Sequence, residues 1–480
     1  MAFLPEVWAP LGLAGFVALF YLWSRVPGAR ESAVIGLAFG AGLFGVGVSW
    51  IYISLSRFGG MPAPLAAFAT LIFCTYLAAY PAALGWLQAR LRGPLAIRLG
   101  LLLPALWTLA EWLREELFTG FPWLAIAYAT PGTPLAGFAP LAGGYAAGFV
   151  LLSCCGLTAY VLANPAPARR SLPALAVLIA LIAAGSGLRR VDWTQAARAP
   201  VSVALLQGNI AQDLKFDPAR YTATLDTYAE LAEGSHAQLI VLPETAVPRL
   251  LEQVSPAFLE RLASVARRNG GDLLLGAPLG RTIEGRREYY NSVVTLGSSP
   301  AQRYDKRHLV PFGEFIPPGF RWVLAVLSIP LSDFSSGAGR QAPLAVGGLR
   351  VASNICYEDA FGAEIRRALP EANLLVNVSN VAWFGDSLAP VQHLQIARLR
   401  ALEAGRIHLT ATNTGITAAI DRDGRVLARL PQFVARRLEV DAIAYEGATP
   451  YVRFGDAPAL ALCVLIALGG LAFARRRANR

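Results

Sequence analysis

Long uncharged apolar runs fill most of the first 190 residues and return once near the C-terminus. A membrane-spanning helix needs about 20 predominantly apolar residues. Seven segments approach this length: Val7–Ser24, Ala33–Ile53, Pro64–Leu87, Leu99–Leu113, Gly144–Ala163, Leu172–Leu188 and Ala457–Ala474. The pattern predicts a transmembrane helix bundle of about six spans over residues 1–190, and a C-terminal span with a basic tail over residues 455–480.

Between residues 198 and 447 the pattern changes to short β-rich runs separated by amphipathic stretches. The β-rich runs are Val201–Leu206, Leu239–Leu242, Leu273–Gly276, Ser292–Leu296, Leu349–Ile355, Leu374–Val378, His408–Thr412 and Thr417–Asp421. The amphipathic stretches include Tyr221–Glu233, Ala257–Arg268 and Gln392–Ala404. Strands that alternate with helices are typical of an α/β fold in which helices cover a buried sheet. We therefore expect one large extramembrane α/β domain.

Composition supports this division of the chain. The hydrophobic fraction is 55%, the charged fraction is 15% and the mean hydropathy is +0.46, whereas about a quarter of a soluble protein is charged. The net charge of +10 could indicate nucleic-acid binding, but the arginines cluster beside apolar runs and no nucleic-acid-binding motif occurs. Membrane topology explains the basic residues better. A transporter is disfavoured because the span centres carry almost no charge.

The loops between the predicted spans differ in their content of arginine. One alternate set carries eleven: Arg25, Arg30, Arg90, Arg92, Arg98, Arg169, Arg170, Arg475, Arg476, Arg477 and Arg480. The opposite short loops carry only Arg57 and Arg114. Basic loops stay in the cytoplasm, so we expect the α/β domain to face away from it. Seven spans then leave Met1 outside, which suggests that an upstream span is missing or that the first helix starts outside.

Lysine is nearly absent from the chain. Of 42 basic residues only Lys215 and Lys306 are lysines. Lysine differs from arginine in having a compact ammonium group whose pKa can shift on burial. The bias therefore favours a function for Lys306, whereas Lys215 could be a chance survivor.

Two polar residues directly follow predicted strands. Glu244 comes after Leu239–Leu242 and Pro243, and active sites gather at the carboxyl ends of strands in α/β folds. A carboxylate held against apolar walls has a raised pKa and suits a general base; the alternative is an ordinary loop glutamate. Lys306 precedes a loop that contains Glu314 and that prolines and a glycine hold in a fixed shape. The alternative here is a solvated basic loop.

Cys356 is the only one of five cysteines that lies outside an apolar run. The strand Leu349–Ile355 leads into it, and we expect a helix to begin near Ala360. Amide groups at a helix start lower the pKa of a thiol and can bind an oxyanion. The alternative is a buried structural cysteine, which the polar residues 357–359 disfavour.

A cysteine–histidine pair is the competing catalytic arrangement. The four histidines are His236, His308, His393 and His408, and none lies in a recognisable motif. Glu244 as base and Lys306 as charge stabiliser fit better. No CxxC spacing or Cys/His cluster indicates a metal, and we expect no cofactor.

Around Glu244, Lys306 and Cys356 the chain resembles the nitrilase superfamily, which joins a Glu, a Lys and a Cys at the strand ends of an αββα sandwich. Together with the fused spans, it resembles the membrane-embedded branch, the apolipoprotein N-acyltransferases. Further similar segments are Leu206–Ile210, Leu309–Ile316, Ser379–Ser387 and Ala411–Thr417. The resemblance covers essentially the whole chain. It implies an α-helical transmembrane bundle joined to an α/β nitrilase-like αββα sandwich domain.

The resemblance also implies a reaction. Cys356 would take an acyl chain from the sn-1 ester of a phospholipid such as phosphatidylethanolamine, and hold it as a thioester. The acceptor would be the N-terminal amine of an S-diacylglyceryl-cysteine lipoprotein, in the last step of bacterial lipoprotein maturation. Glu244 would be the base and Lys306 the oxyanion stabiliser, with supporting roles for Glu314, Tyr357 and Glu358. The site would lie on the periplasmic side of the inner membrane.

Three aromatic residues, Trp383, Phe384 and Phe334, could hold acyl chains or brace a lid, or could simply belong to the core. Two features depart from the family. Val381 stands where members often have Asp, and seven predicted spans replace the typical eight. The main rival function is a membrane-anchored nitrilase-type hydrolase of an amide or nitrile. A single anchor would suffice for such an enzyme, so the multi-span bundle argues against it.

Overall fold

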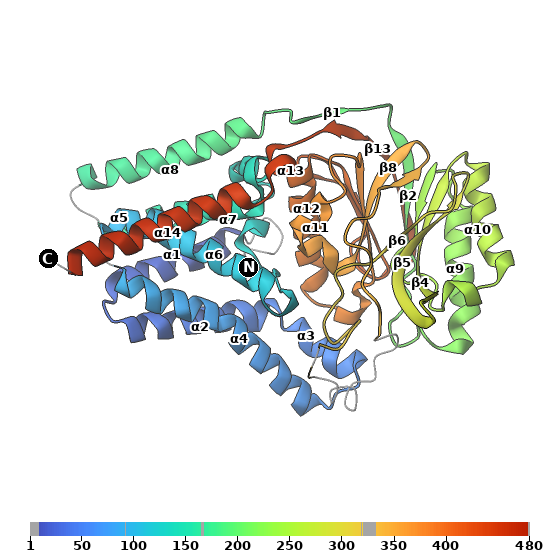
Figure 1. Ribbon diagram of the computed structural model, residues 1–480, viewed down its shortest axis with the longest axis horizontal. Coiled ribbons are helices and arrows are strands. Elements are labelled where there is room, and N and C mark those ends of the chain that lie inside the picture. Colours follow the sequence, from blue (N-terminus) through green and yellow to red (C-terminus); the bar gives the residue numbers. More distant parts are fainter. Residues whose placement is uncertain (1–8, 92, 165–167, 318, 320–332, 479–480) are drawn as a thin grey trace. The chain divides into compact units, whose positions relative to one another are not determined.

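The computed structural model describes residues 9–91, 93–164, 168–317, 319 and 333–478 (Figure 1). The chain divides into two compact units. The helical unit comprises Met1–Ile51, Pro64–Asp192 and Thr449–Arg480. The α/β unit comprises Trp193–Ala448 together with Tyr52–Ala63. The segment Tyr52–Ala63, which includes the last two residues of the second predicted span and the loop to the third, thus belongs to the α/β unit.

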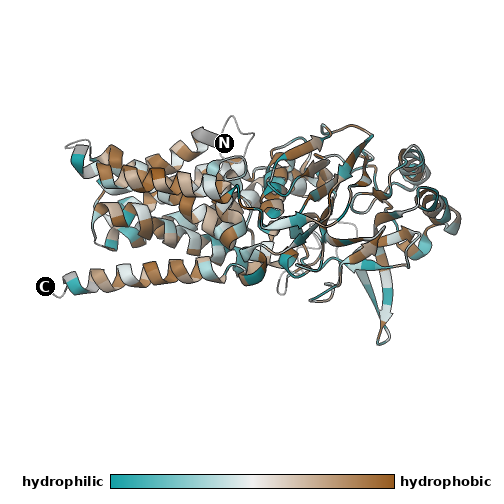
Figure 2. Cartoon of the chain, turned by 90° about the horizontal axis from the view of Figure 1, so that it is seen from above, coloured by the Kyte–Doolittle hydropathy of each residue, from teal (hydrophilic) through white to brown (hydrophobic). Residues whose placement is uncertain are grey.

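Long apolar helices build the helical unit. Its α-helices are α1 (Ala9–Arg25), α2 (Ala29–Gly47), α4 (Ala63–Arg90), α5 (Leu95–Ile97), α6 (Leu103–Glu116), α7 (Ala139–Ala163), α8 (Ala168–Leu188), α13 (Pro450–Phe454) and α14 (Ala457–Ala478), and α3 (Trp50–Ile53) lies at its border with the α/β unit. Shorter helical turns are η1 (Ser54–Phe58, in the α/β unit), η2 (Arg98–Leu102), η3 (Leu117–Thr119), η4 (Ile126–Ala129) and η5 (Pro134–Phe138). Figure 2 shows hydrophobic residues along most of α14 and hydrophilic ones at its C-terminal end.

Six helical segments of the described residues are long and apolar enough to cross a membrane. They are Ala29–Gly47, Ala63–Arg90, Leu95–Thr119, Pro134–Ala163, Ser171–Leu188 and Ala457–Ala474. The predicted span Val7–Ser24 corresponds to a shorter apolar helix, Leu11–Arg25, and its first two residues lie outside the described residues. The predicted span Ala33–Ile53 is interrupted, because α2 ends at Gly47 and α3 begins at Trp50.

Two charged residues at the end of α6 hold the loop that follows. Arg114 Nη1 donates hydrogen bonds to the carbonyl oxygens of Phe121 (2.5 Å) and Trp123 (2.6 Å). Glu111 Oε1 accepts one from the amide of Ile126 at 2.9 Å. Trp123 and Ile126 are buried, so these residues of the loop pack within the helical unit.

The α/β unit contains two six-stranded sheets and a small ribbon. One sheet has the order β12-β11-β10-β9-β8-β7 and the other β13-β2-β3-β4-β5-β6, while β1 pairs with β14. The strands are β1 (Thr194–Ala196), β2 (Val201–Gln207), β3 (Leu239–Val241), β4 (Asp272–Ile283), β5 (Arg286–Gly297), β6 (Arg303–Asp305), β7 (Leu344–Val346), β8 (Leu349–Ile355), β9 (Leu374–Ser379), β10 (His408–Thr412), β11 (Ala418–Ile420), β12 (Val426–Arg429), β13 (Arg436–Ala442) and β14 (Tyr445–Gly447). Parallel pairs join β2 to β3 to β4, and β8 to β9 to β10.

Helices cover the outer faces of both sheets (Figure 1). The helices are α9 (Tyr221–Glu233), α10 (Pro256–Arg268), α11 (Gly362–Arg366) and α12 (Ala389–Ala404), with short turns η6 (Pro218–Arg220), η7 (Leu251–Gln253), η9 (Cys356–Ala360) and η10 (Val381–Phe384). Figure 1 shows α9 and α10 beside the sheet that contains β2 and β4. Pro256 at the start of α10 and left-handed Gly405 after α12 mark these helix ends.

Alternating side chains of the strands build the core of the α/β unit. In β2, Val203 and Leu205 join the cluster that both sheets share, with Val376 of β9 and Leu409 of β10. The intervening residues of β2 belong instead to the cluster with α9 and α10. Successive residues of a strand point to opposite faces, so β2 is buried on both sides. The predicted αββα sandwich is confirmed.

Candidate active site

Three strand ends carry the residues that the sequence singled out. Glu244 lies three residues beyond β3, Lys306 directly follows β6, and Cys356 directly follows β8. The strands β3 and β6 belong to one sheet, and β8 belongs to the other. Because the two sheets pack against each other through a common core, these distant segments can meet.

Glu244, Lys306 and Glu314 form one buried cluster. Lys306 Nζ lies 3.6 Å from Glu244 Oε1 and 2.8 Å from Glu314 Oε2. The side-chain amide of Asn291 donates to both carboxylates, at 2.7 Å and 2.8 Å. Lys306 is 1% exposed and Glu244 is 7% exposed. Neither is a solvated loop residue, so the competing interpretations from sequence are wrong for both.

The backbone of Asn380 links this cluster to the thiol. Its amide donates to Glu244 Oε2 at 2.8 Å, and the thiol of Cys356 also receives a backbone hydrogen bond from Asn380. The charges of Glu244, Lys306 and Glu314 all act on Cys356. The structure therefore brings all three predicted catalytic residues, and Glu314, into one site.

Cys356 sits at a sharp turn. Its φ angle is +55°, a left-handed conformation that costs a non-glycine residue on the order of 1–3 kcal/mol and is found mainly where function requires it. The residue as a whole is partly exposed, whereas its thiol lies among the buried charged groups of this cluster. Burial of the thiol, followed by the Glu244 charge, raises the pKa of Cys356, and the charge of Lys306 only partly offsets this. The resting thiol is therefore protonated and needs a base.

Lys306 has the opposite electrostatics. Burial disfavours its charge, but the carboxylates of Glu314 and Glu244 outweigh burial and raise its pKa. The amine is therefore a permanent ammonium at neutral pH. A fixed cation beside a neutral thiol can stabilise negative charge that appears only during a reaction.

Glu358 holds the turn that follows Cys356. Its Oε1 accepts hydrogen bonds from the Tyr304 hydroxyl (2.9 Å) and from the amide of Arg307 (2.8 Å). Its Oε2 accepts one from the amide of Ile355 at 2.7 Å. Burial raises the pKa of Glu358 to about 7, against the lowering effects of Lys306 and these amides. Glu358 thus ties the strand end before Cys356 to the loop after Lys306.

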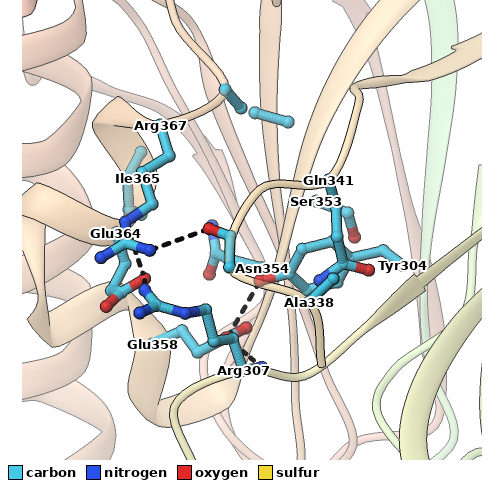
Figure 3. A pocket seen from close by; sticks show the side chains of 13 residues that line it. Tyr304, Arg307, Ala338, Gln341, Ser353, Asn354, Glu358, Glu364, Ile365 and Arg367 are labelled. Carbon is cyan, nitrogen blue, oxygen red and sulfur yellow. Dashed lines mark hydrogen bonds and ion pairs between the residues drawn. The ribbon is translucent and has the colours of Figure 1, made fainter. Parts of the chain in front are cut away.

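A pocket opens beside Glu358 (Figure 3). Tyr304, Arg307, Asn354 and Glu358 are among the residues that line it. Arg307 forms an ion pair with Glu364 there. Cys356 is not among the residues that line this pocket, which borders Glu358 instead.

The helix predicted to begin near Ala360 begins two residues later, which agrees with the prediction. Cys356–Ala360 forms the 3₁₀ turn η9, and the short helix α11 begins at Gly362. The carboxylate of Glu358 accepts the backbone N–H of Ile355, which favours a tight turn. The amides closest to the thiol therefore belong to this turn and to Asn380.

No local sequence pattern indicates the buried polar network that lies next to Cys356. Asp359 Oδ1 lies 2.9 Å from His408 Nε2, and Asp359 Oδ2 lies 3.6 Å from His393 Nε2. His393 also hydrogen-bonds the backbone of Cys356. The histidines stand on β10 and α12 without a local motif, so only the tertiary structure brings them to Asp359. His393 contacts the turn of Cys356 directly, whereas Asn291 holds the carboxylates of Glu244 and Glu314.

The predicted aromatic residues lie on segments next to this cluster. Phe334 donates its amide to the carbonyl of Glu314 at 2.9 Å. Trp383 and Phe384 belong to η10, which follows Asn380, and both are partly exposed. The segment Tyr52–Ala63 contacts η10: the Ser54 hydroxyl donates to the Trp383 carbonyl at 2.8 Å. Tyr357 directly follows the thiol, and its ring packs on Phe361.

A thiol, a carboxylate and an ammonium in this arrangement suit nucleophilic acyl transfer. The carboxylate can take the thiol proton, and the ammonium can stabilise a tetrahedral oxyanion. Among the described residues, no group of three His, Cys, Asp or Glu side chains has the geometry of a metal site. A thiol beside a carboxylate and an ammonium offers covalent and acid–base chemistry.

The fold and the three strand ends define the α/β unit as a nitrilase-like domain, and residues 202–441 match the carbon-nitrogen hydrolase family. Residues 1–157 match the apolipoprotein N-acyltransferase N-terminal domain. Proteins named apolipoprotein N-acyltransferase from Nitrosomonas europaea and Methylococcus capsulatus are 47% and 44% identical to this chain. Each match covers 99% of this chain and 95% of the relative. The chain belongs to the apolipoprotein N-acyltransferase family.

Among solved structures, an amidase of the nitrilase superfamily from Nesterenkonia is 22% identical, with a TM-score of 0.39. That match covers 55% of this chain and 97% of the amidase. The family assignment rests on the full-length relatives, and it confirms the resemblance expected from the sequence.

Proposed function

We propose that this chain transfers an acyl chain from a phospholipid to the N-terminal amine of S-diacylglyceryl-cysteine in apolipoproteins, through a thioester on Cys356. Membership of the family supports N-acylation in lipoprotein maturation. The observation that carries the mechanism is the approach of Lys306 to Glu244, at 3.6 Å, with both charges acting on Cys356. Hydrolysis of an amide or nitrile is not favoured, because the relatives that match the full length are named as acyltransferases.

The first half-reaction would load the enzyme. Glu244 takes the thiol proton while Cys356 Sγ attacks the sn-1 ester carbonyl, and a C–S bond forms. Lys306 and the Tyr357 amide stabilise the oxyanion. When the ester C–O bond breaks, the proton passes from Glu244 to the departing alcohol and a lysophospholipid leaves. The raised pKa of Cys356, caused mainly by burial, makes the base necessary.

The second half-reaction would unload it. The lipoprotein amine attacks the thioester carbonyl, Glu244 takes the amine proton, and the C–S bond breaks. The proton then returns to the thiolate of Cys356, and an amide is released. A thioester keeps enough acyl-transfer potential for this step. The two products leave one after the other, so the kinetics would be ping-pong.

Supporting residues would fix these groups. Glu314 keeps Lys306 charged and oriented, with its carboxylate 2.8 Å from the amine. Glu358 holds the turn of Cys356 through the amide of Ile355. Trp383, Phe384 and Phe334 would contact the acyl chains, because they are partly exposed apolar residues on the segments that follow Asn380 and Glu314. No cofactor takes part in this scheme.

We expect incubation with phospholipid alone to leave one acyl group on Cys356. Without an amine acceptor the second half-reaction cannot proceed, so the thioester accumulates. Intact-protein mass spectrometry would detect the added mass, and neutral hydroxylamine would remove it. A Glu244→Gln variant is the matched control and should load far more slowly. Active protein whose Cys356 stays unmodified would exclude the covalent route.

We also propose an orientation. Residues 198–447 would face the periplasm, residues 1–190 and 455–480 would hold the spans, and the C-terminal tail would be cytoplasmic. The arginine-rich loops support this topology. The inner membrane would then present the site to both lipid-anchored substrates.

Single cysteines can test this orientation. In a Cys356→Ala background, an Arg286→Cys variant should react with a membrane-impermeant maleimide in intact spheroplasts. The exposed Arg286 lies at the tip of the β4–β5 hairpin. Arg90→Cys, on a predicted cytoplasmic loop and also exposed, should react only after the membrane is opened. The reverse pattern of labelling would invert the topology.

A further inference from the structure

The two lysines of the chain converge on the same glutamate. Lys215 is 2% exposed, and its Nζ donates to the backbone carbonyl of Glu244 at 3.2 Å. Lys306 approaches the carboxylate of the same residue at 3.6 Å. In a sequence with 42 basic residues, chance survival would not be expected to bring both lysines to one buried residue. Lys306 stabilises the oxyanion in the proposed reaction, whereas Lys215 has no role in that scheme.

The loop that carries Lys215 is held rigidly to the site. It follows β2, and the amide of Ile210 donates to Asn413 Oδ1 at 2.9 Å. Gln212 Oε1 accepts a hydrogen bond from the side chain of Asn380 at 2.8 Å. Asn380 is the residue whose backbone faces both Glu244 and Cys356. These hydrogen bonds hold the loop that positions the amine of Lys215 beside Glu244, and a functional group needs such positioning.

A count of charges shows what the site lacks without Lys215. Glu244 and Glu314 bring two negative charges when ionised, and Lys306 brings one positive charge. Glu358 also interacts with Lys306, but burial raises the pKa of Glu358 to about 7, so it is largely neutral at pH 6. The remaining negative charge is buried and opposes the formation of a thiolate on Cys356. An ammonium at position 215 balances it. The charged groups that act on Lys215 are Glu244 and Cys356.

We propose that Lys215 is a positioning residue of the acyl-transfer site, whose ammonium neutralises the excess negative charge and lets Cys356 ionise. This inference deepens the proposed function and rests on it. The amine of Lys215 also holds the turn at Glu244, because it donates a hydrogen bond to the carbonyl oxygen of Glu244. It need not touch the substrate, because it acts on the thiol through the shared electrostatic field.

Titration of Lys215 gives this role a measurable signature. Burial lowers the pKa of Lys215 to about 7, although Glu244 and Cys356 act to raise it. Below this pH the amine is charged, and the thiolate fraction rises tenfold per pH unit. Above this pH the predominant state has a neutral amine on Lys215 and a neutral thiol on Cys356. The state with a charged amine and a thiolate contains the same number of protons, so the fraction of this state no longer rises with pH. The rate of alkylation of Cys356 should therefore show a break near pH 7.

The test measures alkylation of Cys356 by iodoacetamide in the full-length protein in detergent, from pH 5.5 to 8.5, by peptide mass spectrometry. Lys215→Met should react about tenfold more slowly at pH 6 and show no break, because its charge is absent at every pH. Lys215→Arg should keep the rate at pH 6 and lose the break, since arginine stays charged. Asp213→Asn, an exposed change in the same loop, should retain both rate and break.

Two results would overturn the proposal: a wild-type profile without a break near pH 7, or a Lys215→Met protein that reacts like the wild type at pH 6. A purely structural lysine would alter stability without removing the break. If Lys215→Met does not fold, the profile of Lys215→Arg decides. Alkylation needs no acyl donor, so a wild-type enzyme that fails to form an acyl-enzyme would count against the proposed function and leave this measurement intact.

Discussion

Replacing Cys356 by serine will lower acyl transfer by at least about 10⁴-fold, in line with the loss of a nucleophile in other covalent enzymes. A serine hydroxyl is far less acidic than a thiol, and the surroundings of Cys356 already disfavour the anion because burial raises its pKa. The carboxylate of Glu244 would then have to remove a proton from a hydroxyl group that is a much weaker acid. The side chains are similar in size, so the fold should survive.

The measurement is transfer of a labelled acyl chain from phospholipid to a diacylated lipopeptide by purified protein. Cys155→Ser is the matched control, since Cys155 is buried in α7 of the helical unit, and it should retain near-normal transfer. Thermal unfolding of both variants would show that folding is intact. Retention of more than about a hundredth of the activity in Cys356→Ser would contradict nucleophilic catalysis by this thiol.

Apolar strands at the centre of the sheets were predictable from the sequence. The predicted runs Leu349–Ile355 and His408–Thr412 coincide with β8 and β10, and Tyr221–Glu233 coincides with α9. Nearly every residue of β8 and β10 is buried, and apolar residues alternate with buried polar ones such as Asn354 and His408. Burial of the strands in the sheet therefore explains the sequence pattern from which they were predicted.

Edge strands and the exposed hairpin were missed or shortened. The edge strand β13 has the sequence RRLEVDA and alternates between partly buried and exposed residues. The predicted strand Leu273–Gly276 is only part of β4, which runs on to Ile283 and turns back into β5. Glu284 and Gly285 both have positive φ angles, as a two-residue hairpin turn requires. Such strands are difficult to predict because charged residues occupy their solvent-facing positions, and only the backbone pairing with the neighbouring strand defines them.

The residues that we propose as catalytic could be predicted from the sequence because each follows a strand, but their hydrogen-bond partners could not. Asn291 lies in the middle of β5, and no local pattern distinguishes it. Its contact with Glu244 at 2.7 Å depends on the packing of distant strands. The burial of Lys215 beside Glu244 depends on packing in the same way. Local sequence predicts which side chains could react, whereas the tertiary structure decides which other side chains bind them and shift their pKa values.

Lys306→Arg will lower transfer by about 10²–10³-fold, the usual effect of losing an oxyanion stabiliser, even though the charge is kept. Lys306 is 1% exposed and lies between two carboxylates, at 3.6 Å from Glu244 and 2.8 Å from Glu314. A guanidinium is larger and planar, and it prefers to bind a carboxylate with two parallel hydrogen bonds. It would bind Glu244 or Glu314 and turn its charge away from the acyl carbonyl.

Lys306→Met is the matched comparison, because it removes the charge at similar volume. If position and charge are both required, the two variants should lose transfer to a similar degree, and both should load acyl groups on Cys356 slowly. Alkylation of Cys356 separates the causes: Lys306→Arg should retain much of it, since a nearby cation still favours the thiolate, whereas Lys306→Met should lose it. Full transfer activity in Lys306→Arg would mean that any cation suffices at this position, and the scarcity of lysine elsewhere in the chain would then say nothing about Lys306.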